Sequence, residues 1–184
     1  TGQSYGLDMT REMLEVARAN QANVGATNVE FLEGTIEAIP LPENAVDVII
    51  SNCVINLSTD KDQVLREAFR VLAPGGRLAV SDIVIRRELP EAVRKDMELW
   101  TGCIAGALLE SDYKSRLAAA GFTDISIEPT RVYERADTAE IASSAGCCGG
   151  DSEAALAALD GAVMSAFIRA TKPASGKAID EARG

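Results

Sequence analysis

Segments with the character of β-strands alternate along this chain with segments that have helical spacing. Residues 46–51, 76–81 and 163–171 are apolar or alternating runs of strand length. Between the first two, apolar residues recur at helical spacing after Asp60, a residue type that commonly caps helices, and the pattern ends at residues 74–76. Such alternation is typical of a parallel sheet with helices on both faces. We therefore predict an α/β fold.

Weaker patterns complete the expected order of elements. The strand pattern of residues 76–81 is lost after Asp82, where charged residues dominate up to Val93. The other expected elements are, in chain order, a buried strand at 5–7, a helix at 10–25, a strand at 29–32, a loop at 34–44, helical spacing from 93 to 108, a helix at 112–120, a strand at 125–133 and an alanine-rich helix at 152–159.

Composition restricts the kind of protein that these elements can form. The chain has 184 residues, of which 47% are hydrophobic and 25% charged, and we expect one domain at residues 1–172 and a disordered tail at 173–184. No apolar run approaches the roughly 20 residues of a membrane-spanning helix, and no signal-like segment is present, so we expect a cytoplasmic protein. A net charge of −10 disfavours nucleic acid and anionic membranes as partners and favours a small-molecule substrate.

The chain contains four cysteines, Cys53, Cys103, Cys147 and Cys148, and no histidine. The cysteine spacing fits neither a zinc finger nor a zinc ribbon, and a chain with this much apolar core does not need a disulfide scaffold. We therefore expect thiols in a reducing compartment. Because histidine is absent, any reaction at this protein uses another base or needs none.

The beginning of the chain differs from that of a complete nucleotide-binding sheet. Such a sheet opens with a strand, a glycine-rich turn and a helix, and an acidic residue about 20 residues later accepts hydrogen bonds from a ribose. Asp8 follows a strand-like segment as that acidic residue would, but no glycine loop precedes it. Either the first strand and its glycine loop are missing, or Asp8 is a turn residue, which is equally typical after a strand.

Several motifs resemble those of class I methyltransferases. Two of these motifs are specific and look like the arsenite methyltransferase family. They are Ser51-Asn52-Cys53-Val54-Ile55-Asn56-Leu57 and Trp100-Thr101-Gly102-Cys103-Ile104-Ala105-Gly106-Ala107-Leu108. The resemblance runs from the first residues to about Pro173. Three broader motifs, shared with quinone-biosynthesis C-methyltransferases, are Gly6-Leu7-Asp8-Met9-Thr10, Glu33-Gly34-Thr35-Ile36-Glu37 and Leu72-Ala73-Pro74-Gly75-Gly76.

This resemblance implies a Rossmann-like class I methyltransferase fold, with a mostly parallel, doubly wound sheet and an antiparallel last strand. The present chain would be truncated at its N-terminus and would lack the first strand and the glycine loop. The implied cofactor is S-adenosylmethionine. Six residues match the cofactor positions of the family: Asp8 at the ribose, Met9, Thr35, Ile36 and Glu37 at the adenine, and Asn52 near the methionine part.

The resemblance also assigns roles to the thiols. Cys53 and Cys103 would be catalytic thiolates that bind arsenic, and Cys147 and Cys148 match a C-terminal pair that would relay arsenic, close a disulfide or bind arsenic outside the site. Trivalent arsenic is soft and prefers thiolate ligands. Its lone pair can attack the methyl group of the cofactor directly, so proximity and alignment replace proton transfer, in keeping with the absence of histidine.

The implied function is methyl transfer from S-adenosylmethionine to trivalent arsenic, in arsenic detoxification. The substrate would be arsenite or its thiol conjugates, and a thiol reductant, glutathione or thioredoxin, would be a co-substrate. We expect a monomer, and we expect this fragment alone to be inactive.

Two other functions stay open. A small-metabolite C-methyltransferase of the quinone-biosynthesis type would share Asp8 and the loop at Gly34, but it would not explain Cys53 and Cys103 together. A non-catalytic metalloid-binding protein would rely on the adjacent cysteines at 147 and 148. Considered singly, a cysteine at a strand end or in a helical stretch is also a common small core residue.

Overall fold

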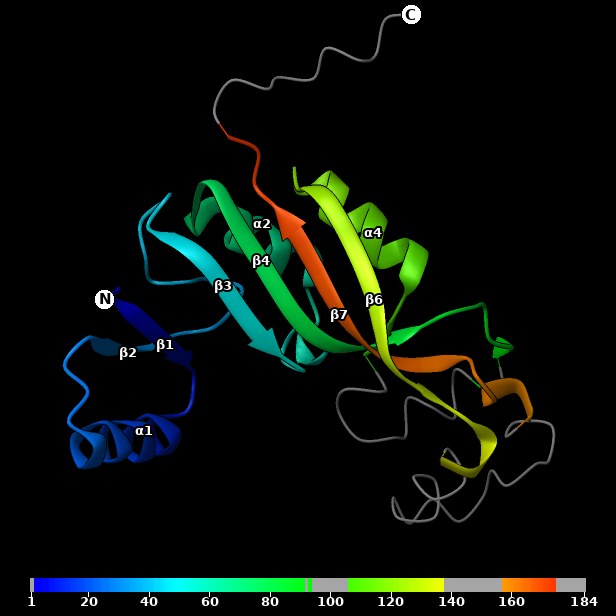
Figure 1. Ribbon diagram of the computed structural model, residues 1–184, viewed down its shortest axis with the longest axis horizontal. Coiled ribbons are helices and arrows are strands. Elements are labelled where there is room, and N and C mark those ends of the chain that lie inside the picture. The colour runs from blue at the N-terminus through cyan, green and yellow to red at the C-terminus, as the bar shows by residue number, and fades with distance from the viewer. Residues whose placement is uncertain (1, 92, 94–105, 138–156, 175–184) are drawn as a thin grey trace, which may run out of the picture.

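The computed structural model describes residues 2–91, 93, 106–137 and 157–174 (Figure 1). Its elements are, in chain order, β1 (Ser4–Asp8), α1 (Arg11–Val24), β2 (Val29–Glu33), β3 (Val46–Asn52), the short 3-10 helix η1 (Ile55–Leu57), α2 (Lys61–Val71), β4 (Leu72–Ile85), β5 (Leu108–Leu109), α4 (Glu110–Ala119), β6 (Thr123–Tyr133) and β7 (Val163–Thr171). The strands β1 and β2 form one sheet, and a five-stranded sheet has the order β3-β4-β7-β6, with β5 paired to β4.

The direction of the strands changes along the main sheet. β3 and β4 are parallel, as are β1 and β2, whereas β7 is antiparallel to both of its neighbours, β4 and β6. The α/β class and the antiparallel last strand are therefore confirmed. The bounds of β7 coincide with the predicted residues 163–171, because inward apolar residues alternate there with outward polar ones.

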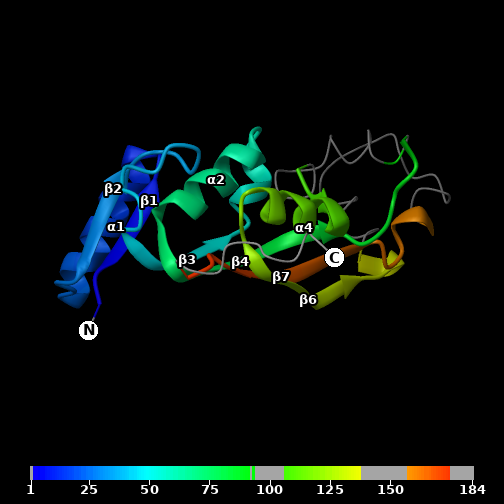
Figure 2. The same ribbon diagram turned by 90° about the horizontal axis from the view of Figure 1, so that it is seen from above.

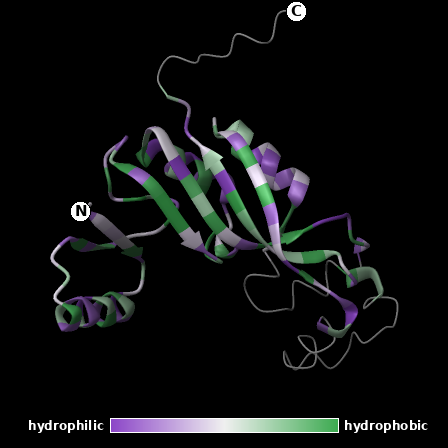
Figure 3. Cartoon of the chain, viewed as in Figure 1, coloured by the Kyte–Doolittle hydropathy of each residue, from purple (hydrophilic) through white to green (hydrophobic). Residues whose placement is uncertain are grey.

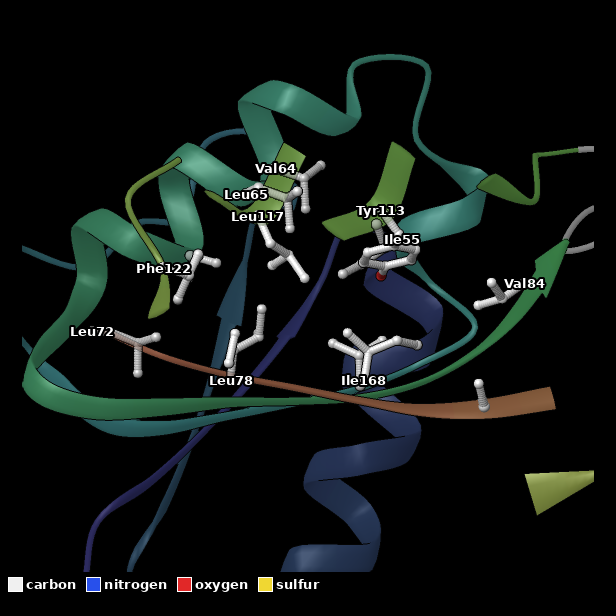
Figure 4. Packing of buried hydrophobic residues seen from close by; sticks show 14 of the residues in the cluster. Ile55, Val64, Leu65, Leu72, Leu78, Val84, Tyr113, Leu117, Phe122 and Ile168 are labelled. Carbon is white, nitrogen blue, oxygen red and sulfur yellow. The ribbon is translucent and has the colours of Figure 1, made fainter. Parts of the chain in front are cut away.

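The main core lies between one face of the five-stranded sheet and the helices α2 and α4, which Figure 2 shows on the same side. Leu78 and Val80 of β4 and Ile168 of β7 point toward Leu65 of α2 and Leu117 of α4, and all five are at most 1% exposed (Figure 4). Burying each such side chain contributes about 1.5–3 kcal/mol to folding. Parts of the chain lie outside the described residues, so the predicted cover of both faces by helices stays a prediction.

Local signals set the helix boundaries as predicted. Asp60 accepts a hydrogen bond from the Gln63 amide at 2.9 Å and so caps α2. Helix α1 ends at Gly25, and the chain leaves α4 at Gly121, both of which have positive φ angles that glycine adopts without strain. No helix in the described ranges has both the length and the apolar character needed to cross a membrane.

Three sequence predictions about the middle of the chain are wrong. β4 begins at Leu72, directly after α2, because the segment with two glycines pairs with Lys172 at the end of β7. β4 also continues through Asp82 to Ile85, although the charge at Asp82 breaks the apolar pattern. Leu108 belongs to the short strand β5 beside Val84 of β4, and not to a helix. Residues 94–105 of the predicted helix at 93–108, most of the predicted helix at 152–159 and most of the tail lie outside the described residues.

The N-terminal unit β1-α1-β2 forms a small layer beside the main sheet (Figure 1). Leu14 is its one fully buried apolar side chain, and Met13 and Val16 on α1 are each 54% exposed. The predicted burial of the first strand is wrong, since Tyr5 of β1 is 39% exposed. β1 pairs with β2 on one side only among the described strands, so its other edge is open.

Candidate active site at the carboxyl ends of the strands

The predicted cofactor residue Asp8 ends β1, and its backbone oxygen accepts a hydrogen bond from the Gly34 amide at the end of β2. Asp8 Oδ1 accepts a hydrogen bond from the Thr10 amide at 2.8 Å, so the carboxylate also shapes the turn into α1. Met9 is 73% exposed beside it. The carboxyl ends of parallel strands are the usual ligand edge of an open α/β sheet, and Asp8 stands on that edge.

The loop that contains Thr35, Ile36 and Glu37 is tied to α2. The Glu37 carboxylate accepts a hydrogen bond from the Ser58 hydroxyl at 2.5 Å, and this bond holds the pKa of Glu37 below its usual range. The Glu37 backbone oxygen accepts from the Gln63 side chain at 3.1 Å. Thr35 forms an isolated bridge with Ala38. The three residues of this loop that were predicted to contact the adenine therefore stand in a loop of fixed shape. One carboxylate oxygen of Glu37 already accepts the hydrogen bond from Ser58.

A groove of about 890 Å³ separates β1 from β3. Its walls include residues 3–5 and Leu7 on one side and the whole of β3 on the other, and Ile36 also lines it. β3 is hydrophobic along most of its length in Figure 3, yet Ile50 is 82% exposed. Two open strand edges thus face one groove, and Ile36 and Asn52, both predicted cofactor residues, lie along it.

Cys53 directly follows Asn52 at the carboxyl end of β3 and is half-buried. Its φ angle is 55°, in the left-handed region that a cysteine rarely adopts, and its amide donates a hydrogen bond to the Ser81 oxygen of β4 at 2.9 Å. Left-handed residues other than glycine are enriched at functional sites, where the surrounding structure compensates for the strain. The backbone therefore fixes Cys53 on the same edge of the sheets as Asp8.

Two polar residues next to Cys53 were missed by the sequence analysis. Asn56 is 2% exposed and donates from Nδ2 to the Ile83 oxygen at 2.8 Å, and Asp82 is 1% exposed in β4. Burial raises the pKa of Asp82 to about 6, although hydrogen bonds from Ile83 and Asn56 and the charge of Lys61 lower it. A charged residue inside an otherwise apolar strand is the signal that could have revealed Asp82.

The other three cysteines lie outside the described residues. Gly106, three positions after Cys103, packs so closely on the backbone oxygen of Asn56 that a Cβ atom at position 106 would collide with it. Gly106 therefore lies directly against Asn56 of η1, which itself follows Cys53. In the described ranges, no three acidic or cysteine side chains gather as metal ligands would.

The family model described as "Methyltransferase domain" matches residues 1–121. The chain therefore belongs to the methyltransferase domain family, and its mixed α/β architecture is that of the Rossmann-like class I fold. Within this family the similarity is to arsenite methyltransferases, as the motifs predicted. The "Arsenite methyltransferase" of Halobacterium salinarum is 45% identical over 128 residues, which cover 70% of this chain and 33% of that protein.

A solved structure agrees with this similarity. An arsenic (III) S-adenosylmethionine methyltransferase from Chlamydomonas reinhardtii is 34% identical, with a TM-score of 0.70 over 97% of this chain and 58% of that one. A ubiquinone/menaquinone biosynthesis C-methyltransferase of Escherichia coli is 41% identical over 81 residues, which cover 44% of this chain. The present chain spans about a third of the length of the arsenite methyltransferase of Halobacterium salinarum.

Proposed function

We propose that this chain is part of the catalytic domain of an S-adenosylmethionine-dependent arsenite methyltransferase. The observation that carries the proposal is the place of Cys53, which is held in a left-handed turn beside Asn52 at the ligand edge of the sheets. The names of the similar proteins in Halobacterium and Chlamydomonas support arsenic as the substrate. Cys103 is the proposed second thiolate, on the resemblance of its motif, and Gly106, three positions further on, packs on Asn56 of η1.

The chemistry suits these thiols. Thiolates displace hydroxyl groups from arsenite, since trivalent arsenic is a soft centre, and the arsenic lone pair remains available. The bound cofactor supplies a methyl group on a positively charged sulfur. The lone pair forms the As–C bond while the electrons of the broken C–S bond return to that sulfur, and arsenic is thereby oxidised from the trivalent to the pentavalent state. A thiol reductant then restores trivalent arsenic, and Cys147 and Cys148 are proposed to assist arsenic transfer or this redox step.

The chain's own residues fit the cofactor at one edge. Asp8 offers a carboxylate to the ribose hydroxyls, and Met9 offers an exposed thioether side chain to the adenine. Thr35, Ile36 and Glu37 would contact the adenine edge, and Asn52 would contact the methionine part.

We further propose that the groove between β1 and β3 holds a parallel strand that ends in a glycine-rich turn. The open edges of both strands and the greater length of the relatives support this proposal. On this basis the present chain alone is inactive, because the groups that bind the methionine carboxylate come from that turn.

The substitution Cys53→Ser in the intact protein tests the function. A serine hydroxyl binds trivalent arsenic poorly, so methylation of arsenite should fall by at least about 100-fold, whereas the Kd for the cofactor should stay within about twofold. The assay measures methylated arsenic in the presence of a thiol reductant, and calorimetry measures the cofactor affinity. Cys103→Ser should have the same effect, because Cys103 is the proposed second thiolate.

The same variants separate the alternatives. A quinone-type C-methyltransferase, which the Escherichia coli similarity favours as second candidate, would keep its activity on a carbon acceptor after Cys53→Ser. A non-catalytic metalloid-binding protein would bind arsenite in the Cys53→Ser variant as tightly as before, with no response to the cofactor. Full arsenite methylation by Cys53→Ser would show that Cys53 is not a thiolate of the methylation site. No arsenite methylation by the native intact protein would show that the proposed function is wrong.

A further inference from the structure

Asp82 occupies an unfavourable position for a carboxylate. It lies between Val80 and Val84 on the face of β4 that points to α2 and α4, where its neighbours form the apolar core. The Ile83 amide donates to Asp82 Oδ1 at 3.0 Å, while Oδ2 has no hydrogen bond within the described residues. A buried carboxylate with an unsatisfied oxygen costs stability, so its presence calls for a role beyond packing.

The residues that follow Cys53 are bound to β4 on both sides of Asp82. We call residues 53–58 the Cys53 turn. The Cys53 amide donates to the Ser81 oxygen at 2.9 Å, and Asn56 Nδ2 donates to the Ile83 oxygen at 2.8 Å. These two oxygens flank Asp82 in the sequence, and Asn56 is close enough to the Asp82 carboxylate to lower its pKa. The turn is therefore attached to β4 on both sides of Asp82.

Charged and apolar neighbours hold the far end of the Cys53 turn. Lys61 Nζ, at the start of α2, donates to the Ser58 oxygen at 2.8 Å, and its positive charge favours the ionised form of Asp82. Ile55 is 3% exposed and belongs to the same buried cluster as Tyr113 of α4 (Figure 4). Burial raises the pKa of Tyr113, and the negative charge of Asp82 raises it further. The turn thus joins β4, α2 and α4 at one point.

The conformation of Cys53 depends on these attachments. A cysteine in the left-handed conformation is strained by about 1 kcal/mol. It keeps this conformation only where contacts with the surrounding structure compensate for the strain. If the turn were released from β4, rotation of φ to an ordinary value would redirect the side chain. The direction of the thiol is therefore set by contacts several residues away from it.

We propose that Asp82 and Asn56 are positioning residues that hold the Cys53 turn on β4 and thereby fix the direction of the Cys53 thiolate. This inference rests on the proposed function for its catalytic consequence. Asp82 acts as the buried acceptor for Asn56, and Asn56 links that acceptor to the turn and supports the segment at Gly106. Neither residue touches the reacting atoms.

The experiment uses four variants: Asp82→Leu, Asn56→Ala, the two combined, and Asp82→Asn, which keeps one acceptor oxygen. The first readout is the rate at which iodoacetamide alkylates Cys53 in the 184-residue chain, followed by mass spectrometry of the Cys53 peptide. Asp82→Leu and Asn56→Ala should each raise this rate by about tenfold, because local opening exposes the thiol. The combined variant should be no faster than either, since both act on one turn.

The second readout is arsenite methylation by the intact protein. Asp82→Leu and Asn56→Ala should lower kcat by about 100-fold, the usual cost of displacing a reacting group by about 1 Å, while the Kd for the cofactor is unchanged. Asp82→Asn should restore most of the rate. Leu159→Ala is the control: it creates a cavity in the second apolar cluster, away from the turn, and should lower the melting temperature without changing either readout.

The outcomes are distinct. Unchanged alkylation in both Asp82→Leu and Asn56→Ala, or an equal rise in Leu159→Ala, overturns the inference. If Asp82→Leu does not fold, Asn56→Ala and Asp82→Asn decide the question on the same readouts. If the native intact protein methylates no arsenite, the proposed function fails, whereas the alkylation rates still decide whether Asp82 and Asn56 position Cys53.

Discussion

Asp82 is the one buried carboxylate in the described part of the chain, and its environment makes stability depend on pH. Burial raises its pKa to about 6, above the value of about 3.9 expected in the unfolded chain. The folded protein therefore binds this proton more tightly than the unfolded chain. The contribution of Asp82 to stability is most favourable below about pH 4 and is lost as the pH rises through about 6.

Asp82→Asn should remove this dependence. At pH 7.5 the variant should be more stable than the native chain by about 1–3 kcal/mol, because no charge remains to be buried, and the difference should shrink at pH 4.5. Urea denaturation of both proteins at the two pH values measures it. A variant that is less stable than the native chain at pH 7.5 would contradict the stated direction.

The sequence predicted Cys53 but not the residues that orient it. Cys53 was found because its motif is specific to one family, whereas Asn56 lies in the same motif without a role that the pattern could show. Asp82 was interpreted as the end of strand character, since an isolated charge normally marks a surface. Its burial follows from the convergence of β4, η1 and α4, which only the folded chain reveals.

At the scale of elements, Lys172 connects the end of β7 to the end of α2. Its Nζ donates to the backbone oxygens of Phe69 at 2.8 Å and Leu72 at 2.7 Å and to the Asn44 side chain at 2.9 Å. It also lies 4.7 Å from the centre of the Phe69 ring. These are the carbonyl groups that a helix leaves unpaired at its C-terminus, where a positive charge is favourable.

Lys172→Met should therefore destabilise the protein. It keeps the apolar stem but removes three charge-assisted hydrogen bonds, so the free energy of unfolding should fall by about 1.5–3 kcal/mol in denaturant titration. The matched control is Lys114→Met, which removes an exposed pair with Glu110 on α4 and should cost no more than about 0.5 kcal/mol. Equal losses in the two variants would count against a special role for Lys172.

Element boundaries were predictable where a local residue sets them. Such local signals are the cap at Asp60, the glycines after α1 and α4, and the alternation of residues 163–171. Each boundary that they set lies within one or two residues of its predicted place. The early start of β4 and the short strand β5 depend on pairing with distant residues. Pairing of this kind has no local signal, so a strand at Leu108 was mistaken for part of a helix.

At the scale of the whole molecule, the main feature is the groove that divides the two sheets. The cofactor site proposed on this edge uses both Asp8 and Asn52, and these residues belong to different sheets. The strand proposed to fill the groove would join the sheets and set the spacing between the two residues. In the present chain the loop at residues 34–45 connects the two sheets. Hydrogen bonds from the Arg70 side chain to the backbone oxygens of Ile39 and Leu41 give this loop a defined shape.

The 184-residue chain should bind S-adenosylmethionine weakly for this reason. We expect a Kd at least about 100-fold higher than that of the intact protein, because the proposed strand and glycine turn would add about 3 kcal/mol of contacts to the methionine end. Calorimetry on both proteins measures the difference. Binding of equal strength would show that the proposed strand and glycine turn are unnecessary for the cofactor.

The central place of β7 also affects the order of synthesis and folding. β7 is the last strand in the described part of the chain, yet it lies between β4 and β6 and supplies the ladder that joins them. A nascent chain that has emerged only as far as β6 exposes one edge of β4 and all of β6 without their partner. Because such edges promote association with other chains, the protein passes through its most aggregation-prone state just before Thr171 leaves the ribosome.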